Sequence, residues 1–96
     1  MLMNKQDKEF IITVIKKLLP QAHIYLFGSR ARKDNQPESD IDVAIDNNQK
    51  IDLHTLSIIK EEIEESSIPF TVDIIDLQAV SDDFKEQILK DGVLWQ

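Results

Sequence analysis

Residues 27–46 read FGSRARKDNQPESDIDVAID and combine a Gly-Ser turn, two arginines, a polar loop and an alternating run. The apolar stretch of residues 24–27 ends at Gly28, which predicts a short buried strand followed by a turn. Residues 40–46 carry Ile or Val at every odd position, and this period of two predicts a second strand with one face in the core. Asp40 and Asp42 then project side by side from its other face.

The rest of the chain predicts helices and one more strand around these two. Apolar residues recur at helical spacing in two segments, the first of which stops at Pro20. Ser81 has the side chain of an N-cap for a last helix, and the apolar residues 93–95 are expected to pack back on the body. The expected elements are a helix over residues 5–19, a strand over 24–27, a helical turn over 29–33, a loop over 34–39, a strand over 40–46, a helix over 51–65, a strand over 70–77 and a helix over 82–91.

This order of elements predicts an α/β (α+β) fold, in which a small mixed β-sheet packs against helices. The 96 residues are expected to form a single domain, residues 1–96. The chain has no cysteine, no apolar run of membrane-spanning length and no signal-like start, which favours a cytoplasmic protein without membrane association. Its 11 basic and 18 acidic residues give a net charge of −7, which argues against direct nucleic-acid binding.

The two aspartates of the second strand suggest a metal site. Side chains at i and i+2 of a strand point the same way, roughly 6.6–6.8 Å apart, and two carboxylates at that distance repel unless a cation lies between them. Mg²⁺ is often held by such carboxylates together with substrate phosphates. Asp73 on the third strand is the expected third ligand, and Asp76 is a less favoured rival because its side chain falls on the opposite face. The alternative interpretation places Asp40 and Asp42 on the solvated face of an edge strand.

The Gly-Ser turn suggests an anion site beside these carboxylates. Gly28 directly after a buried strand allows a sharp turn that brings backbone N–H groups close to a ligand, and such groups bind phosphate oxygens. The Ser29 hydroxyl can add a donor, while Arg30 or Arg32 can neutralise phosphate charge. A Gly-Ser turn alone is most often only a turn. The spacing of anion site, loop and paired aspartates makes a phosphate site the better interpretation.

The segments GSRAR, SDIDVAI and VDIID resemble the signature of the DNA polymerase β-like nucleotidyltransferase superfamily. Over nearly all of its length, the chain is similar to the minimal nucleotidyltransferases of bacteria and archaea, which consist of the catalytic domain alone. The resemblance implies the polymerase β-like fold. It also implies that two Mg²⁺ ions are held by Asp40, Asp42 and Asp73, and that Asp73 acts on the incoming nucleophile.

The same resemblance implies the substrate and its contacts. The triphosphate of ATP would bind at the Gly-Ser turn and at neighbouring residues of the two motifs. These residues are Gly28, Ser29, Arg30, Arg32 and Ser39.

The resemblance further implies a partner. Minimal nucleotidyltransferases of this kind commonly occur with a HEPN-domain toxin and transfer AMP from ATP onto one of its hydroxyl groups. The expected activity is therefore that of an antitoxin-type protein adenylyltransferase, and the acidic charge suits docking to a basic RNA-binding protein. Two alternatives stay open, namely a non-catalytic antitoxin that neutralises its partner by contact alone, and transfer to a small molecule such as an aminoglycoside.

Overall fold

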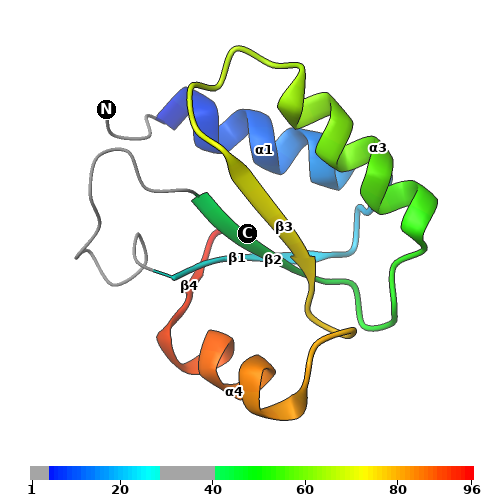
Figure 1. Ribbon diagram of the computed structural model, residues 1–96, viewed down its shortest axis with the longest axis vertical. Helices are drawn as coiled ribbons and strands as arrows, with labels where there is room; N and C mark the ends of the chain where they lie inside the picture. Colours follow the sequence, from blue (N-terminus) through cyan, green and yellow to red (C-terminus); the bar gives the residue numbers. More distant parts are fainter. Residues whose placement is uncertain (1–4, 29–40) are drawn as a thin grey trace.

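The computed structural model describes residues 5–28 and 41–96, which form a four-stranded sheet between helices (Figure 1). Strand order in the sheet is β3-β2-β1-β4. β2 pairs antiparallel with β1 and parallel with β3, and β1 pairs antiparallel with β4, so the sheet is mixed as expected. The elements are α1 (Lys5–Leu18), β1 (His23–Phe27), β2 (Ile41–Asp46), α3 (Leu53–Glu64), β3 (Val72–Asp76), α4 (Asp82–Asp91) and β4 (Val93–Leu94).

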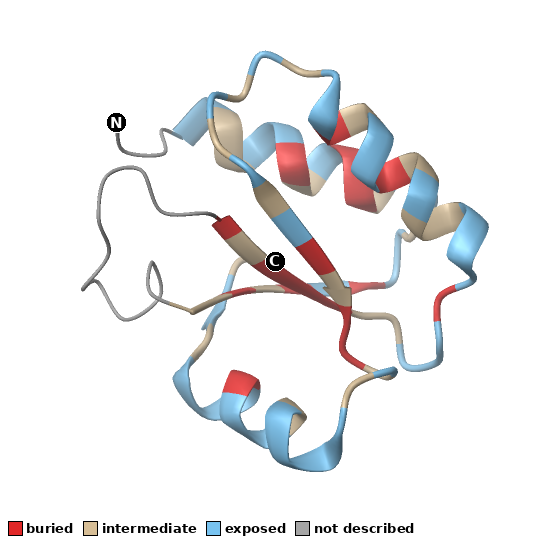
Figure 2. Ribbon diagram, in the orientation of Figure 1, coloured by how far each residue is buried: buried red, intermediate tan, exposed pale blue. Residues whose placement is uncertain are grey.

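Helices cover both faces of the sheet. α1 and α3 pack on one face, where the odd-numbered Ile and Val residues of β2 join the main apolar core. α4 lies on the opposite face (Figure 1), where Ala44, Leu77 and Ile88 form a second buried cluster. The expectation that β2 has only one core face was therefore wrong. The face of β2 that carries Asp42 is also buried at Ala44, which has no exposed surface and packs in one cluster with Ile88 of α4. Figure 2 shows the buried colour along most of β2.

The helix after β2 begins two residues later than expected. Asp52 is its N-cap, since the Asp52 carboxylate accepts hydrogen bonds from Thr55 N at 2.9 Å and from Thr55 Oγ1 at 2.7 Å. Ile51 lies before the cap and is buried in the main core, so its place in the apolar pattern reflects burial of the loop rather than of a helix. The N-cap predicted for the last helix is confirmed, because Ser81 Oγ accepts a hydrogen bond from Phe84 N at 3.2 Å.

The C-terminal segment forms a strand, which the apolar pattern had not indicated. Val93 and Leu94 pair with β1 and are 45% and 56% exposed, so this part of the tail adds an edge to the sheet and does not enter the core. Trp95 is half-buried against the main core, and its backbone N–H donates to Ile24 O at 2.7 Å. Among the described residues, no helix has the length and apolar character needed to cross a membrane.

Candidate active site

Asp42 and Asp73 occupy paired positions on adjacent strands. β2 and β3 run parallel, and their register aligns the Cα atoms of these two residues. Because aligned residues of neighbouring strands project from the same face, both carboxylates lie on the face of the sheet that also carries α4. β2 is an internal strand, so the alternative of a solvated edge strand is wrong for Asp42. Asp42 is half-buried, whereas Asp73 on the outer strand β3 is exposed.

Gly28 lies directly against the Asp42 side chain. The preceding residue, Phe27, pairs with Asp42 in the antiparallel ladder, and Gly28 then turns with a φ of +80°. A Cβ atom at Gly28 would approach Asp42 Oδ2 more closely than real side chains ever do. Both the left-handed backbone and the missing side chain are therefore required here. The turn predicted from the sequence is confirmed, and its main chain is in contact with one of the two carboxylates.

Asp76 has a structural role in this arrangement. It is only 6% exposed and projects from the face opposite to Asp73. Its Oδ2 accepts a hydrogen bond from Ile51 N at 2.8 Å, and its Oδ1 accepts one from Gln78 N at 3.0 Å. These bonds tie the loop before α3 to the end of β3. The geometry therefore brings Asp73, and not Asp76, beside Asp42.

Asp46 lies at the far end of β2, on the same face as Asp42. Burial disfavours its charged form, but hydrogen bonds from Gln78 Nε2 at 2.8 Å and from Asn48 N at 3.0 Å, with the charge of Lys85 nearby, outweigh this and lower the pKa of the Asp46 carboxyl. Lys85 Nζ also donates to Gln78 Oε1 at 3.3 Å. The sequence had indicated only a strand end here. The structure adds a polar link between β2 and α4.

The remaining predicted site residues, Ser29, Arg30, Arg32, Ser39 and Asp40, lie outside the described residues. Within residues 5–28 and 41–96, no group of three or more His, Cys, Asp or Glu side chains is placed to hold a metal ion. The described pair nevertheless fits a hard divalent cation, because two carboxylates in register offer oxygen ligands from a single face. Asp40 stays the predicted third ligand.

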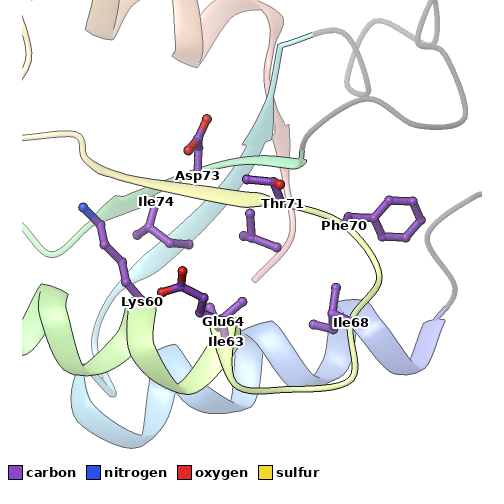
Figure 3. Close-up of a pocket in the computed structure, with 9 residues that line it drawn as sticks. Lys60, Ile63, Glu64, Ile68, Phe70, Thr71, Asp73 and Ile74 are labelled. Atoms are coloured by element: carbon purple, nitrogen blue, oxygen red, sulfur yellow. The ribbon is translucent and has the colours of Figure 1, made fainter.

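Two cavities among the described residues lie near these elements, one lined in part by Asp73 and the other by Gly28. The larger, of about 360 Å³, lies between α3 and β3 and has Asp73 in its wall (Figure 3). The smaller, of about 150 Å³, lies between the end of β1 and α4 and has Gly28 in its wall. Its other walls include the rings of Phe27 and Phe84, which meet edge to face with centroids 5.9 Å apart. Sequence reasoning missed Phe84, because an apolar residue on a helix face gives no signal of a cavity.

The sequence profile of the family described as "Polymerase beta, Nucleotidyltransferase" matches residues 9–95. This chain belongs to that family. The match includes Gly28, Asp42 and Asp73, so the residues that the structure brings together lie inside the family's own segment. The fold is accordingly the polymerase β-like nucleotidyltransferase fold, with three described helices and a four-stranded mixed sheet.

The chain is also similar to individual proteins and solved structures of known description. The probable protein adenylyltransferase MntA of Haemophilus influenzae is 31% identical over 93 residues, covering 97% of this chain and 82% of the relative. A crystal structure of a toxin-antitoxin with AMP-PNP has 26% identity and a TM-score of 0.76, covering 91% of this chain and 70% of that one. A structure of a tri-AMPylated Shewanella oneidensis HEPN toxin in complex with MNT antitoxin has 25% identity and a TM-score of 0.73, covering 96% of this chain and 71% of that one.

Proposed function

We propose that this nucleotidyltransferase moves AMP from ATP onto a hydroxyl group of a partner protein, and that it acts as antitoxin to a HEPN toxin. The observation that carries the proposal is the register of Asp42 and Asp73 beside the Gly28 turn. A relative named as a protein adenylyltransferase and a neighbouring structure with an AMPylated HEPN toxin support the choice of group and acceptor. Because ATP is the substrate, we expect the protein in the cytoplasm.

The reaction is an in-line displacement at the α-phosphorus of ATP. A bond forms between the acceptor oxygen and phosphorus, the bond from phosphorus to the bridging oxygen breaks, and pyrophosphate leaves. Asp73 is exposed beside Asp42 and takes the proton of the acceptor hydroxyl. Mg²⁺ ions held by Asp40, Asp42 and Asp73 would neutralise the triphosphate and the leaving group when bound.

The nucleotide binds on the Gly28 side of the aspartate pair. The turn at Gly28 offers backbone N–H groups to phosphate oxygens, with Ser29, Arg30, Arg32 and Ser39 as further predicted contacts. The small cavity beside Gly28 has aromatic walls and takes the flat base or the ribose. This part of the proposal accounts for the exposed ring of Phe84, which is 40% exposed next to the site.

A second candidate function is neutralisation by contact alone, without transfer. The acidic net charge of −7 favours binding to a basic partner under either function. The aspartate pair argues against a purely passive role, because like charges directly opposite each other on adjacent strands are destabilising and a passive binder gains nothing from them.

The test combines the purified chain with the candidate toxin, Mg²⁺ and each NTP in turn, and measures the intact mass of both proteins. A gain of one or more AMP masses on the toxin with ATP, absent with Asp42→Asn, supports the transferase. A stable complex whose masses do not change with any NTP would favour neutralisation by contact. A mass gain with another nucleotide would correct the substrate but keep the reaction.

A further inference from the structure

β3 has one open edge in the part of the chain that the structure describes. It pairs with β2 on one side and with no described strand on the other. Thr71 O accepts a hydrogen bond from Ile41 N at 2.9 Å, and Leu77 N donates to Ile45 O at 2.9 Å. The N–H and C=O of one strand residue point to the same side, and successive residues alternate. Val72 and Ile74 therefore direct their backbone N–H and C=O groups toward the open edge.

The large cavity runs along this open edge. Val72 and Ile74 line it together with the C-terminal half of α3 and the connection to β3. In Figure 3 the Ile74 side chain points toward α3, while the Asp73 carboxylate points to the opposite side of the strand. The other lining residues are Lys60, Ile63, Glu64, Ile68, Phe70 and Thr71.

The order of the strands places the proposed nucleotide site and the approach of the acceptor on opposite sides of the aspartate pair. Gly28 follows β1 and touches Asp42 on β2, while Asp73 is on β3, one strand further out. In-line displacement requires the nucleophile and the leaving group on opposite sides of the reacting phosphorus. If the phosphates lie toward Gly28, the acceptor oxygen has to arrive from the side of Asp73. That side is the open edge of β3.

We infer that the acceptor polypeptide adds to the open edge of β3 as an extended strand. Its main chain pairs with Val72 and Ile74, which is the mode by which extended peptides join a sheet edge. Because side chains alternate along a strand, the hydroxyl-bearing residue lies on the face of Asp73 and its two neighbours enter the cavity beside α3. The inference rests on the proposed function, since it assigns a binding site to the protein acceptor of that reaction.

The cavity also sets the expected sequence of that acceptor segment. Its walls are apolar at Ile63, Ile68 and Phe70, while Lys60 and Glu64 lie one helical turn apart on α3. The two residues that flank the hydroxyl-bearing residue are therefore expected to have side chains that are apolar in the part nearest the backbone. A long polar or charged end would be able to reach Lys60 or Glu64.

The test is Val72→Pro, with Val72→Thr as the matched control. Proline removes the outward N–H and blocks pairing at the open edge, but such a position tolerates proline because its N–H is not bonded within the sheet. We expect Val72→Pro to lower kcat/KM for the protein acceptor by at least about tenfold with ATP binding unchanged, and Val72→Thr to stay close to wild type. Circular dichroism reports whether Val72→Pro is folded.

A second measurement does not depend on that variant. In the wild-type complex with the acceptor protein, residue-resolved amide exchange should show new protection at Val72 and Ile74. Unchanged exchange at both amides, in a complex that transfers AMP, would overturn the strand addition and leave the proposed function standing. Absence of any transfer by the wild type to its partner would overturn the proposed function and this inference with it.

Discussion

Asp42 and Asp73 lie at paired positions on parallel neighbouring strands, one half-buried and one exposed. The half-buried carboxylate is also in contact with the backbone of Gly28, so the Asp42 position lies between the Gly28 turn and the outer strand that carries Asp73. This arrangement gives the two acids different environments.

Asp42→Asn and Asp73→Asn should each reduce nucleotidyl transfer by about 10²–10⁴-fold, as expected when a proton acceptor or charge partner is lost. Asp73→Asn should keep or slightly raise stability in the absence of Mg²⁺, because it removes repulsion between carboxylates that face each other. Transfer rates by intact mass and urea unfolding test the two effects. Asp83→Asn makes the same chemical change at an exposed site in the first turn of α4; it should leave transfer unchanged and lower the free energy of unfolding by only about 0.3–1 kcal/mol, because the helix dipole favours a negative charge there. Wild-type rates in either site variant would contradict the assignment.

Asp76→Asn should lower stability and leave the transfer rate unchanged, which is the reverse of the effect expected for Asp73→Asn. The buried Asp76 carboxylate accepts two backbone hydrogen bonds, and an amide can satisfy only part of this pattern, so we expect a loss of about 1–3 kcal/mol in the free energy of unfolding. The rate per folded molecule should remain near wild type. Together with Asp73→Asn, this variant separates stability from activity within one strand. A large loss of rate in fully folded Asp76→Asn would place it in the catalytic site.

Gly28→Ala should impair both folding and transfer. The positive φ and the collision with Asp42 Oδ2 are expected to cost about 1–3 kcal/mol, measured by urea unfolding. The collision disappears in an Asp42→Ala background, whereas the backbone strain stays. A double-mutant cycle should therefore show a smaller cost for Gly28→Ala when Asp42 is already alanine. Equal costs in both backgrounds would mean that the carboxylate moves aside freely.

Phe84→Ala should raise KM for the nucleotide several-fold with little change in kcat, because the ring lines the cavity beside Gly28, where the proposed function places the nucleotide away from the reacting atoms. Leu89→Ala is the matched control, since Leu89 is 44% exposed on the same helix and does not line that cavity. Steady-state kinetics at varied ATP concentration provide the test. A fall in kcat with an unchanged KM would show that the cavity does not bind the nucleotide.

Asp46 should contribute to acid sensitivity. Its pKa is lowered in the folded protein, because hydrogen bonds from Gln78 and Asn48 outweigh the effect of burial. A carboxyl whose folded pKa is lowered stabilises the protein above its ordinary pKa of 3.8, and this stabilisation is lost as the pH falls through the lower value. Urea unfolding between about pH 2 and pH 6 should therefore show a shallower acid decline for Asp46→Asn than for wild type. Parallel curves would assign the decline to other groups.

The local chemistry of this protein could be predicted from the sequence because it depends on neighbours along the chain. Alternation over residues 41–46 and the turn at Gly28 determine strand and turn within a few residues, and Asp42 and Asp73 followed from the same period of two. The N-cap at Ser81 was equally local. The family resemblance added the roles that spacing alone could not provide.

Contacts between distant segments were decided only by the tertiary structure. Burial of Ala44 depends on where α4 packs, the pairing of Val93 and Leu94 depends on an open edge of β1, and the buried role of Asp76 depends on a backbone N–H at Ile51. None of these has a signal within a local window, because each is a contact whose free energy depends on an element brought close by folding. The sequence determined which residues could form a site. The order of the strands determined where they lie: Gly28 directly follows β1, Asp42 is on the neighbouring strand β2, and Asp73 is on the next strand, β3.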